Sequence, residues 1–145
     1  MGYSYILPIK KTEQQTVYWT SLIENMKILV ATEKPFAKVA IDGIREVAEK
    51  AGMELALLEK YTQKEQLLEA VADADALIVR SDIVDAEVLD AAAKLKIVVR
   101  AGAGFDNLDL PACTAHNVVA MNPPGQTSNA VAELALGLMV YAVRN

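Results

Sequence analysis

The chain has 145 residues, of which 53% are hydrophobic and 23% are charged. This is enough apolar material for one domain with a core, so disorder along the whole length is excluded. The net charge is −5 and no basic run is longer than Lys10-Lys11, which argues against a nucleic-acid binder or a binder of anionic membranes. No apolar run approaches the length of a membrane span.

Cysteine and histidine are each represented once, by Cys113 and His116. A lone cysteine cannot form an internal disulfide, which favours a reducing compartment, and we expect a cytoplasmic protein. We expect Cys113 to be a packed thiol and His116 to be a surface residue. A metal site of the usual Cys/His type is therefore not expected.

Residues 1–25 differ in composition from the rest and lack the pattern of a secretory signal, so we treat them as a leader of unknown role. From Met26 onward, short apolar runs alternate with helical patterns. The sequence predicts helices over 36–52, 85–94, 109–116 and 128–143. It predicts a further helix that begins after an N-cap at Thr62, with Glu65 completing a capping box. The predicted strands are 27–32, 53–59, 76–80, 96–101 and 118–121.

This β-α-β-α rhythm is typical of a parallel sheet with helices on both faces. The strands are continuous apolar runs, as burial on both faces requires. We therefore predict an α/β fold with a doubly wound, five-stranded parallel sheet, either flavodoxin-like or Rossmann-like. Residues 26–121 form the predicted domain, and residues 122–145 form a linker and a final helix.

Ligands of such sheets bind beyond the carboxyl ends of the strands. The third predicted strand ends in Arg80-Ser81, and the fourth ends in Arg100, followed by the turn Gly102-Ala103-Gly104. Arginine clamps carboxylates or phosphates, and a glycine turn offers backbone N–H groups. We predict a small-anion site here. The alternative is that each arginine is a strand-end cation in water or is paired with Asp82 or Asp106.

The glycine turn does not form a dinucleotide-binding fingerprint. That motif needs a third glycine where Asn107 stands, and it opens the helix after a first strand. We interpret Asp106 and Asn107 as structural turn residues.

The helix over 128–143 is apolar on nearly all sides, which predicts that it is buried between two bodies. The second body would be a missing domain or a partner subunit. The alternative is a helix lodged in a groove of its own domain, with only its tip exposed.

Three segments, LIVRSD (77–82), VVRAGAGFDNLDL (98–110) and VVAMNPPGQTSNAVAELALGLMVYAVRN (118–145), resemble the D-2-hydroxyacid dehydrogenase family, most closely its phosphoglycerate branch. The resemblance implies a flavodoxin-like substrate-binding domain whose last helix leads to an NAD-binding domain. It implies that Arg80, Ser81 and Arg100 lie near the phosphate or carboxylate of the substrate, and that the 102–104 turn binds the carboxylate. Ala103 stands where a residue, commonly Thr, touches the cofactor.

The resemblance also implies NAD-dependent oxidation of 3-phosphoglycerate to 3-phosphohydroxypyruvate, the first step of serine synthesis, in a full-length homodimer. The family's catalytic His, Glu and Arg and its cofactor loop would lie beyond residue 145. We therefore expect no catalytic residue within this chain, and we expect the chain alone to be inactive. The alternatives are a glyoxylate or hydroxypyruvate reductase, a standalone module that binds a small anion, and an interaction domain whose apolar helix pairs with a partner.

Overall fold

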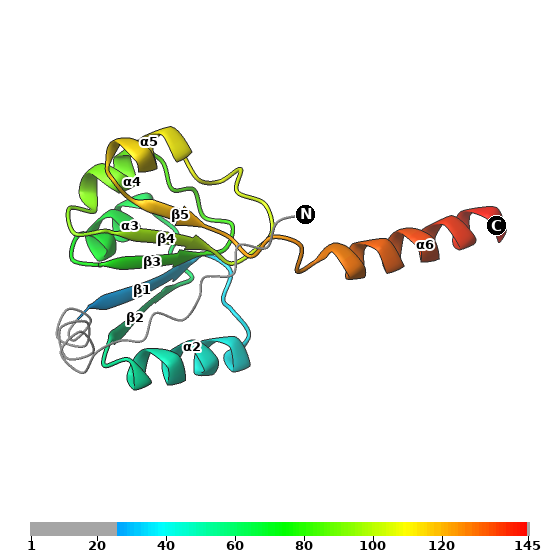
Figure 1. The fold of residues 1–145 in the computed structure, drawn as a ribbon, viewed down its shortest axis with the longest axis horizontal. Coiled ribbons are helices and arrows are strands. Elements are labelled where there is room, and N and C mark those ends of the chain that lie inside the picture. The colour runs from blue at the N-terminus through cyan, green and yellow to red at the C-terminus, as the bar shows by residue number, and fades with distance from the viewer. Residues whose placement is uncertain (1–25, 145) are drawn as a thin grey trace, which may run out of the picture.

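The computed structural model describes residues 26–144, and its centre is a sheet of five strands (Figure 1). The strands are β1 (Lys27–Thr32), β2 (Glu54–Glu59), β3 (Ala76–Val79), β4 (Ile97–Arg100) and β5 (Val119–Met121). The helices are α2 (Lys38–Lys50), α3 (Lys64–Val71), α4 (Ala86–Ala91), α5 (Leu110–Ala115) and α6 (Ser128–Arg144). Every predicted element is present, and every strand lies within one or two residues of its predicted position.

All strand pairs are parallel, and the strand order is β2-β1-β3-β4-β5. This order is that of the flavodoxin-like fold, which confirms the prediction and decides against the Rossmann-like order. The crossover from β1 to β2 runs one way across the sheet, and the later crossovers run the other way. Because such crossovers are right-handed, α2 lies on one face and α3, α4 and α5 lie on the other (Figure 1).

The core lies between the sheet and the layer of α3, α4 and α5. It combines alternate strand residues such as Leu77, Val79 and Val98 with Val71 and Val88 of the helices, all fully buried. On the opposite face, α2 packs mainly against β2.

The prediction of burial on both faces is wrong at β5. There Val119 and Met121 are 56% and 52% exposed, because none of the helices described between residues 26 and 144 covers that part of the α2 face.

Two helix ends show how local chemistry sets the element boundaries. The predicted N-cap at Thr62 is wrong by one residue: α3 begins after Gln63, and the side chain of Gln66, rather than Glu65, accepts hydrogen bonds from the backbone N–H groups of Thr62 and Gln63. Helix α2 ends as expected near Gly52, whose φ of 70° suits glycine.

Helix α6 projects away from the body of the domain (Figure 1), and none of its residues is buried. The alternative that this helix lodges in its own domain's groove is therefore wrong. Its large apolar side chains are exposed on all sides, with Val131, Leu134, Leu136 and Met139 between 62% and 64% exposed. No helix among residues 26–144 has the length and apolar character needed to cross a lipid bilayer.

Candidate functional site

The carboxyl edge of the sheet has its switch point between β1 and β3, because the chain leaves these neighbouring strands in opposite directions. Ligands of open α/β sheets bind at such a point. A small cavity of about 80 Å³ lies there, lined by Thr32, Glu33 and Lys34 after β1 and by Ser81 and Asp82 after β3. The predicted site residue Ser81 therefore borders a cavity at the position that the topology favours.

Arg80 and Arg100 lie at the carboxyl ends of the neighbouring strands β3 and β4, at this same edge. Arg100 is the last residue of β4 and lies opposite Val79, so Arg80 is one residue further along β3. Arg80 is exposed, and no ion pair links either arginine to a carboxylate among residues 26–144. The alternative in which Asp82 or Asp106 neutralises them is thus not observed.

The guanidinium of Arg100 is held by backbone carbonyls. Its Nε donates to the carbonyl of Arg80 at 3.0 Å, and its Nη1 donates to the carbonyl of Gly104 at 3.3 Å. Of the five guanidinium N–H groups, three remain available to a ligand. Arg100 therefore joins the β3 loop to the glycine turn while it keeps donors for an anion.

The glycine turn is shaped by this arginine. A Cβ atom at Gly102 would lie 2.5 Å from Nη1 of Arg100, and one at Gly104 would lie 3.3 Å from the same atom. Glycine at these positions leaves room for the guanidinium to pack directly on the turn. The carbonyl of Ala103, in the middle of the turn, accepts a hydrogen bond from Nδ2 of Asn122 at 2.6 Å.

Asp82 is a site residue that the sequence analysis considered only as a partner for arginine. It is 6% exposed, and its carboxylate accepts three hydrogen bonds. The donors are the backbone N–H of Glu33 at 2.8 Å, the hydroxyl of Tyr61 at 2.7 Å and the backbone N–H of Arg80 at 3.2 Å. Burial raises the pKa of the Tyr61 phenol, and the bond to Asp82 raises this pKa further.

Asn107 completes the link between the loops. Its Nδ2 donates to the carbonyl of Asp82 at 2.7 Å, and its own carbonyl accepts from the N–H of Val84 at 2.9 Å. This agrees with its interpretation as a structural turn residue. Its Oδ1 is buried and has no hydrogen-bond partner within the part of the chain that the structure describes.

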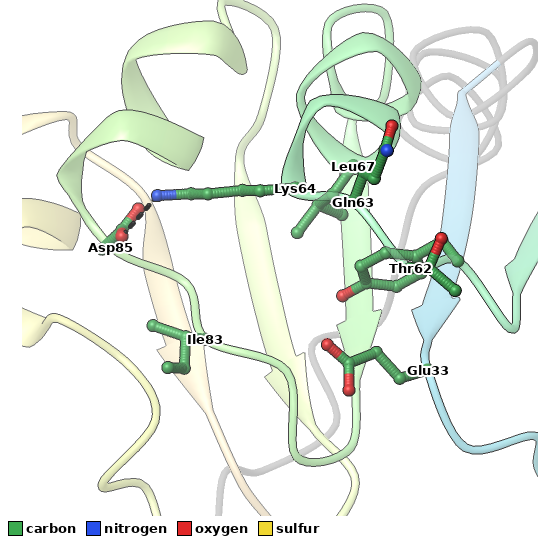
Figure 2. Close-up of a pocket in the computed structure, with 8 residues that line it drawn as sticks. Glu33, Thr62, Gln63, Lys64, Leu67, Ile83 and Asp85 are labelled. Atoms are coloured by element: carbon green, nitrogen blue, oxygen red, sulfur yellow. Dashed lines mark hydrogen bonds and ion pairs between the residues drawn. The ribbon is translucent and has the colours of Figure 1, made fainter.

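A second, larger cavity of about 210 Å³ opens beside α3 (Figure 2). Its cation is Lys64, whose ammonium is bonded to Asp85 at 2.7 Å and to Glu87 at 2.5 Å. Glu33 and Asp85 bring further negative charge to its lining. Because carboxylates already neutralise Lys64, this cavity is a poor anion site.

The remaining singled-out residues lie away from the edge that carries the arginines. His116 follows α5, at the opposite edge of the sheet, and its Nε2 is 3.1 Å from Oδ1 of Asp90. Its surface position confirms the prediction. Cys113 is buried, which confirms the packed thiol, and burial raises the pKa of this thiol. No group of three or more potential metal-ligating side chains occurs within residues 26–144.

The fold and this edge together define a flavodoxin-like domain with a small switch-point cavity beside Ser81, and with Arg80 and Arg100 at the ends of β3 and β4. Residues 28–141 match the family model for the D-isomer specific 2-hydroxyacid dehydrogenase catalytic domain. The chain belongs to this family of oxidoreductases.

Individual relatives give the same assignment. The chain is 42% identical over 124 residues to the D-3-phosphoglycerate dehydrogenase of Archaeoglobus fulgidus, a match that covers 82% of this chain and 21% of that protein. It is 37% identical over 93 residues to the hydroxypyruvate reductase of Thermotoga maritima, covering 63% and 30% of the two chains.

Among solved structures, the chain is similar to the NAD⁺-bound 3-phosphoglycerate dehydrogenase of Entamoeba histolytica. The sequence identity is 55% and the TM-score is 0.75, over 81% of this chain and 39% of that one. The chain thus spans well under half the length of the relatives that it matches.

Proposed function

We propose that this chain is the substrate-binding part of an NAD-dependent D-3-phosphoglycerate dehydrogenase. In that reaction the C2 carbon of 3-phosphoglycerate gives a hydride to NAD⁺ and its hydroxyl loses a proton, which leaves 3-phosphohydroxypyruvate, the first step of serine synthesis. The observation that carries the proposal is the pair Arg80 and Arg100 at the switch-point edge, neither of which pairs with a carboxylate of residues 26–144. The substrate carries a dianionic phosphate and a carboxylate, and a guanidinium group can form charge-assisted hydrogen bonds to each of them.

The roles within the site follow from the positions of the residues. Arg80 and Ser81 would contact one anionic group of the substrate, and Arg100 with the N–H groups of Ala103 and Gly104 would contact the other. The N–H of Gly102 instead donates to the carbonyl of Arg100 at 2.9 Å. Ala103 would face the cofactor without a side-chain hydrogen bond. Its carbonyl is already bonded to Asn122, so any polar contact there falls to the turn's N–H groups.

NAD does not fit residues 26–144 as its main site. The pyrophosphate of a dinucleotide binds a glycine-rich loop that opens a helix, and the only such turn here follows β4 and continues through Asn107. The only histidine lies at the opposite edge of the sheet from the arginines. We therefore propose that NAD and the acid/base groups belong to a part outside these residues. The 145-residue chain with NAD⁺ and 3-phosphoglycerate should form no NADH.

The proposed organisation keeps residues 26–121 as the substrate-binding domain, residues 122–145 as the linker and interdomain helix, and residues 1–25 as a leader. The exposure of α6 on all sides supports its role between bodies. The longer enzyme would be a homodimer, and the free thiol of Cys113 supports a cytoplasmic location.

Titration of 3-phosphoglycerate into the 145-residue chain tests the site. Replacing Arg80 or Arg100 by Ala removes charge-assisted hydrogen bonds worth about 1.5–3 kcal/mol, so the affinity should fall by about 10- to 150-fold. The matched control is Arg45→Ala, because Arg45 pairs only with Asp42 on the exposed side of α2. If neither Arg80→Ala nor Arg100→Ala changes the affinity, the proposed role of the two arginines is overturned.

The similarity to a hydroxypyruvate reductase supports a second candidate, an enzyme for an unphosphorylated 2-hydroxy acid. Titration with hydroxypyruvate in parallel separates the two. A phosphoglycerate enzyme should bind 3-phosphoglycerate more tightly and lose that preference when one arginine is removed. Equal affinity for both compounds in the unaltered chain favours the reductase.

A further inference from the structure

The loops that follow four strands of the sheet meet at one residue, Asp82, and three of them meet at its buried carboxylate. Glu33 follows β1, Tyr61 follows β2 and Arg80 follows β3, and each donates one hydrogen bond to this side chain. The loop after β4 reaches the main chain of the same residue through Asn107. Asp82 itself lies directly beside Arg80-Ser81, the segment proposed to bind the anion.

We propose that Asp82 is the positioning residue of the anion site, holding the Arg80-Ser81 backbone beside the switch-point cavity by tying it to the ends of β1 and β2. The ligand side of this inference rests on the proposed function. Its structural side rests only on the hydrogen bonds given above. Asp82 does not need to touch the substrate, because it acts through Arg80 and Ser81.

The number of donors explains why an ionised carboxylate is suited to this position. An aspartate side chain has two acceptor oxygens and no donor, and here Oδ1 accepts from Glu33 and Tyr61 while Oδ2 accepts from Arg80. An asparagine has the same shape but only one acceptor oxygen. It would place an NH₂ group against at least one N–H or O–H donor and leave that donor without a partner.

The second arginine is tied into the same arrangement. Arg100 donates to the carbonyl of Arg80, and Asn107 donates to the carbonyl of Asp82. The segment from Arg80 to Asp82 is thus hydrogen-bonded at its first residue to Arg100 and at its last residue to Asn107. Loosening Asp82 should therefore displace the β3 loop relative to the glycine turn, and with it the spacing of the two guanidinium groups.

A double-mutant cycle with Asp82→Asn and Arg80→Ala tests whether Asp82 acts through Arg80. The affinity of the 145-residue chain for 3-phosphoglycerate is measured by NMR titration, which reaches millimolar dissociation constants. Asp82→Asn alone should weaken binding by about tenfold, the effect of about 1.4 kcal/mol. In the Arg80→Ala background the same change should cost a clearly smaller factor, because only the part that Asp82 transmits through Ser81 and Arg100 remains. An equal loss in both backgrounds would mean a general structural role and would overturn the proposal.

Backbone amide exchange gives a readout that does not depend on the ligand. Asp82→Asn should speed the exchange of the Arg80 N–H, while the control Asp109→Asn, which alters the cap of α5, should leave it unchanged. If the unaltered chain binds no 3-phosphoglycerate, the proposed function fails and the exchange rate still decides the positioning role. Unchanged exchange at Arg80 would refute that role.

Tyr61→Phe is the milder variant should Asp82→Asn fail to fold. It removes one donor and keeps the buried ring, so the carboxylate remains bonded to the backbone of Glu33 and Arg80. It should reduce affinity for 3-phosphoglycerate by a smaller factor than Asp82→Asn, and its effect should again be smaller in the Arg80→Ala background. A loss that is equally large in both backgrounds would count against the proposal.

Discussion

The contact between Gly102 and Arg100 links the backbone of the glycine turn to the direction of a side chain. The guanidinium occupies the space that a Cβ atom at position 102 would need. Because it is the far end of a long, flexible side chain, it can move aside at little cost. A side chain at position 102 would therefore disturb the site more than the fold.

Gly102→Ala should separate binding from stability. The new methyl group would push the guanidinium away from the carbonyls of Arg80 and Gly104, so affinity for 3-phosphoglycerate should fall by about tenfold, the equivalent of one hydrogen bond to a charged group. The free energy of unfolding should change by less than about 1 kcal/mol. Titration and chemical denaturation measure the two effects. Gly43→Ala is the matched control for affinity, because it is the same substitution on α2 and its Cβ atom would have no neighbour within 4 Å.

Some residues of the site follow from the sequence, and others do not. Arg80, Ser81 and Arg100 were predicted to share one edge, because parallel strands all end at the same edge of a sheet. The role of Asp82 depends on Tyr61 and Glu33, which lie 21 and 49 residues away in the chain. No local spacing carries such a contact, so only the folded structure reveals it.

Single side chains cap the starts of two helices, α4 and α5. Asp85 caps α4 by accepting from the N–H of Val88, and Asp109 caps α5 by accepting from the N–H of Ala112. Both were predicted as the first residues of their helices. At α3, Gln66 accepts hydrogen bonds from the N–H groups of both Thr62 and Gln63, and the helix begins after Gln63, one residue beyond the predicted cap. Sequence patterns therefore predict these starts to within one residue.

The Asp85 carboxylate should make the stability of the domain depend on pH in the acid range. The hydrogen bond from Lys64 lowers the pKa of Asp85 below its value in the unfolded chain, about 3.9. A lowered folded-state pKa adds stability above the unfolded pKa, and this stability is lost as the pH falls through the folded-state pKa. Thermal unfolding should therefore show a steeper loss below about pH 4 than in Asp85→Asn, which keeps a capping side chain.

The control for this experiment is Asp42→Asn, because Asp42 makes only an exposed ion pair on α2. Its acid profile should match that of the unaltered chain. Identical acid profiles for Asp85→Asn and the unaltered chain would show that the Lys64 bond contributes nothing to stability.

The number, order in sequence and direction of the elements were predictable from the alternating rhythm, but the spatial order of the strands was not. A βαβ rhythm fits both a flavodoxin-like and a Rossmann-like order, because each uses the same right-handed crossovers. The partial exposure of β5 was also beyond the sequence pattern. Val119 and Met121 look like buried strand residues, and only the placement of α2 leaves them uncovered.

At the scale of the whole molecule, α6 and the uncovered part of the sheet leave much apolar surface in contact with water. Large apolar patches of this kind usually mark surfaces that associate. On α6 alone, Leu134, Leu138, Val140 and Tyr141 are each more than half exposed. The isolated chain is therefore expected to associate with itself as its concentration rises.

Substituting both Leu136 and Met139 by Glu should abolish this association, because each charged group would have to be buried against an apolar surface. Sedimentation or light scattering over a range of concentrations measures it. The control is Val39→Glu, which alters an exposed apolar residue on α2. If the chain with both glutamates on α6 forms the same oligomer as the unaltered chain, another surface mediates the association.

Among the strands of residues 26–144, β2 lies at one edge of the sheet, and this position has a consequence for the solubility of the chain. An edge strand offers free backbone groups to any other strand, and edge-to-edge growth is a common route to aggregation. In β2 the apolar residues Leu55–Leu58 stand between Glu54 and Glu59. If the β2 strands of two chains paired antiparallel, Glu54 of one strand would lie opposite Glu59 of the other at both ends. Repulsion between these like charges would disfavour edge-to-edge aggregation through β2.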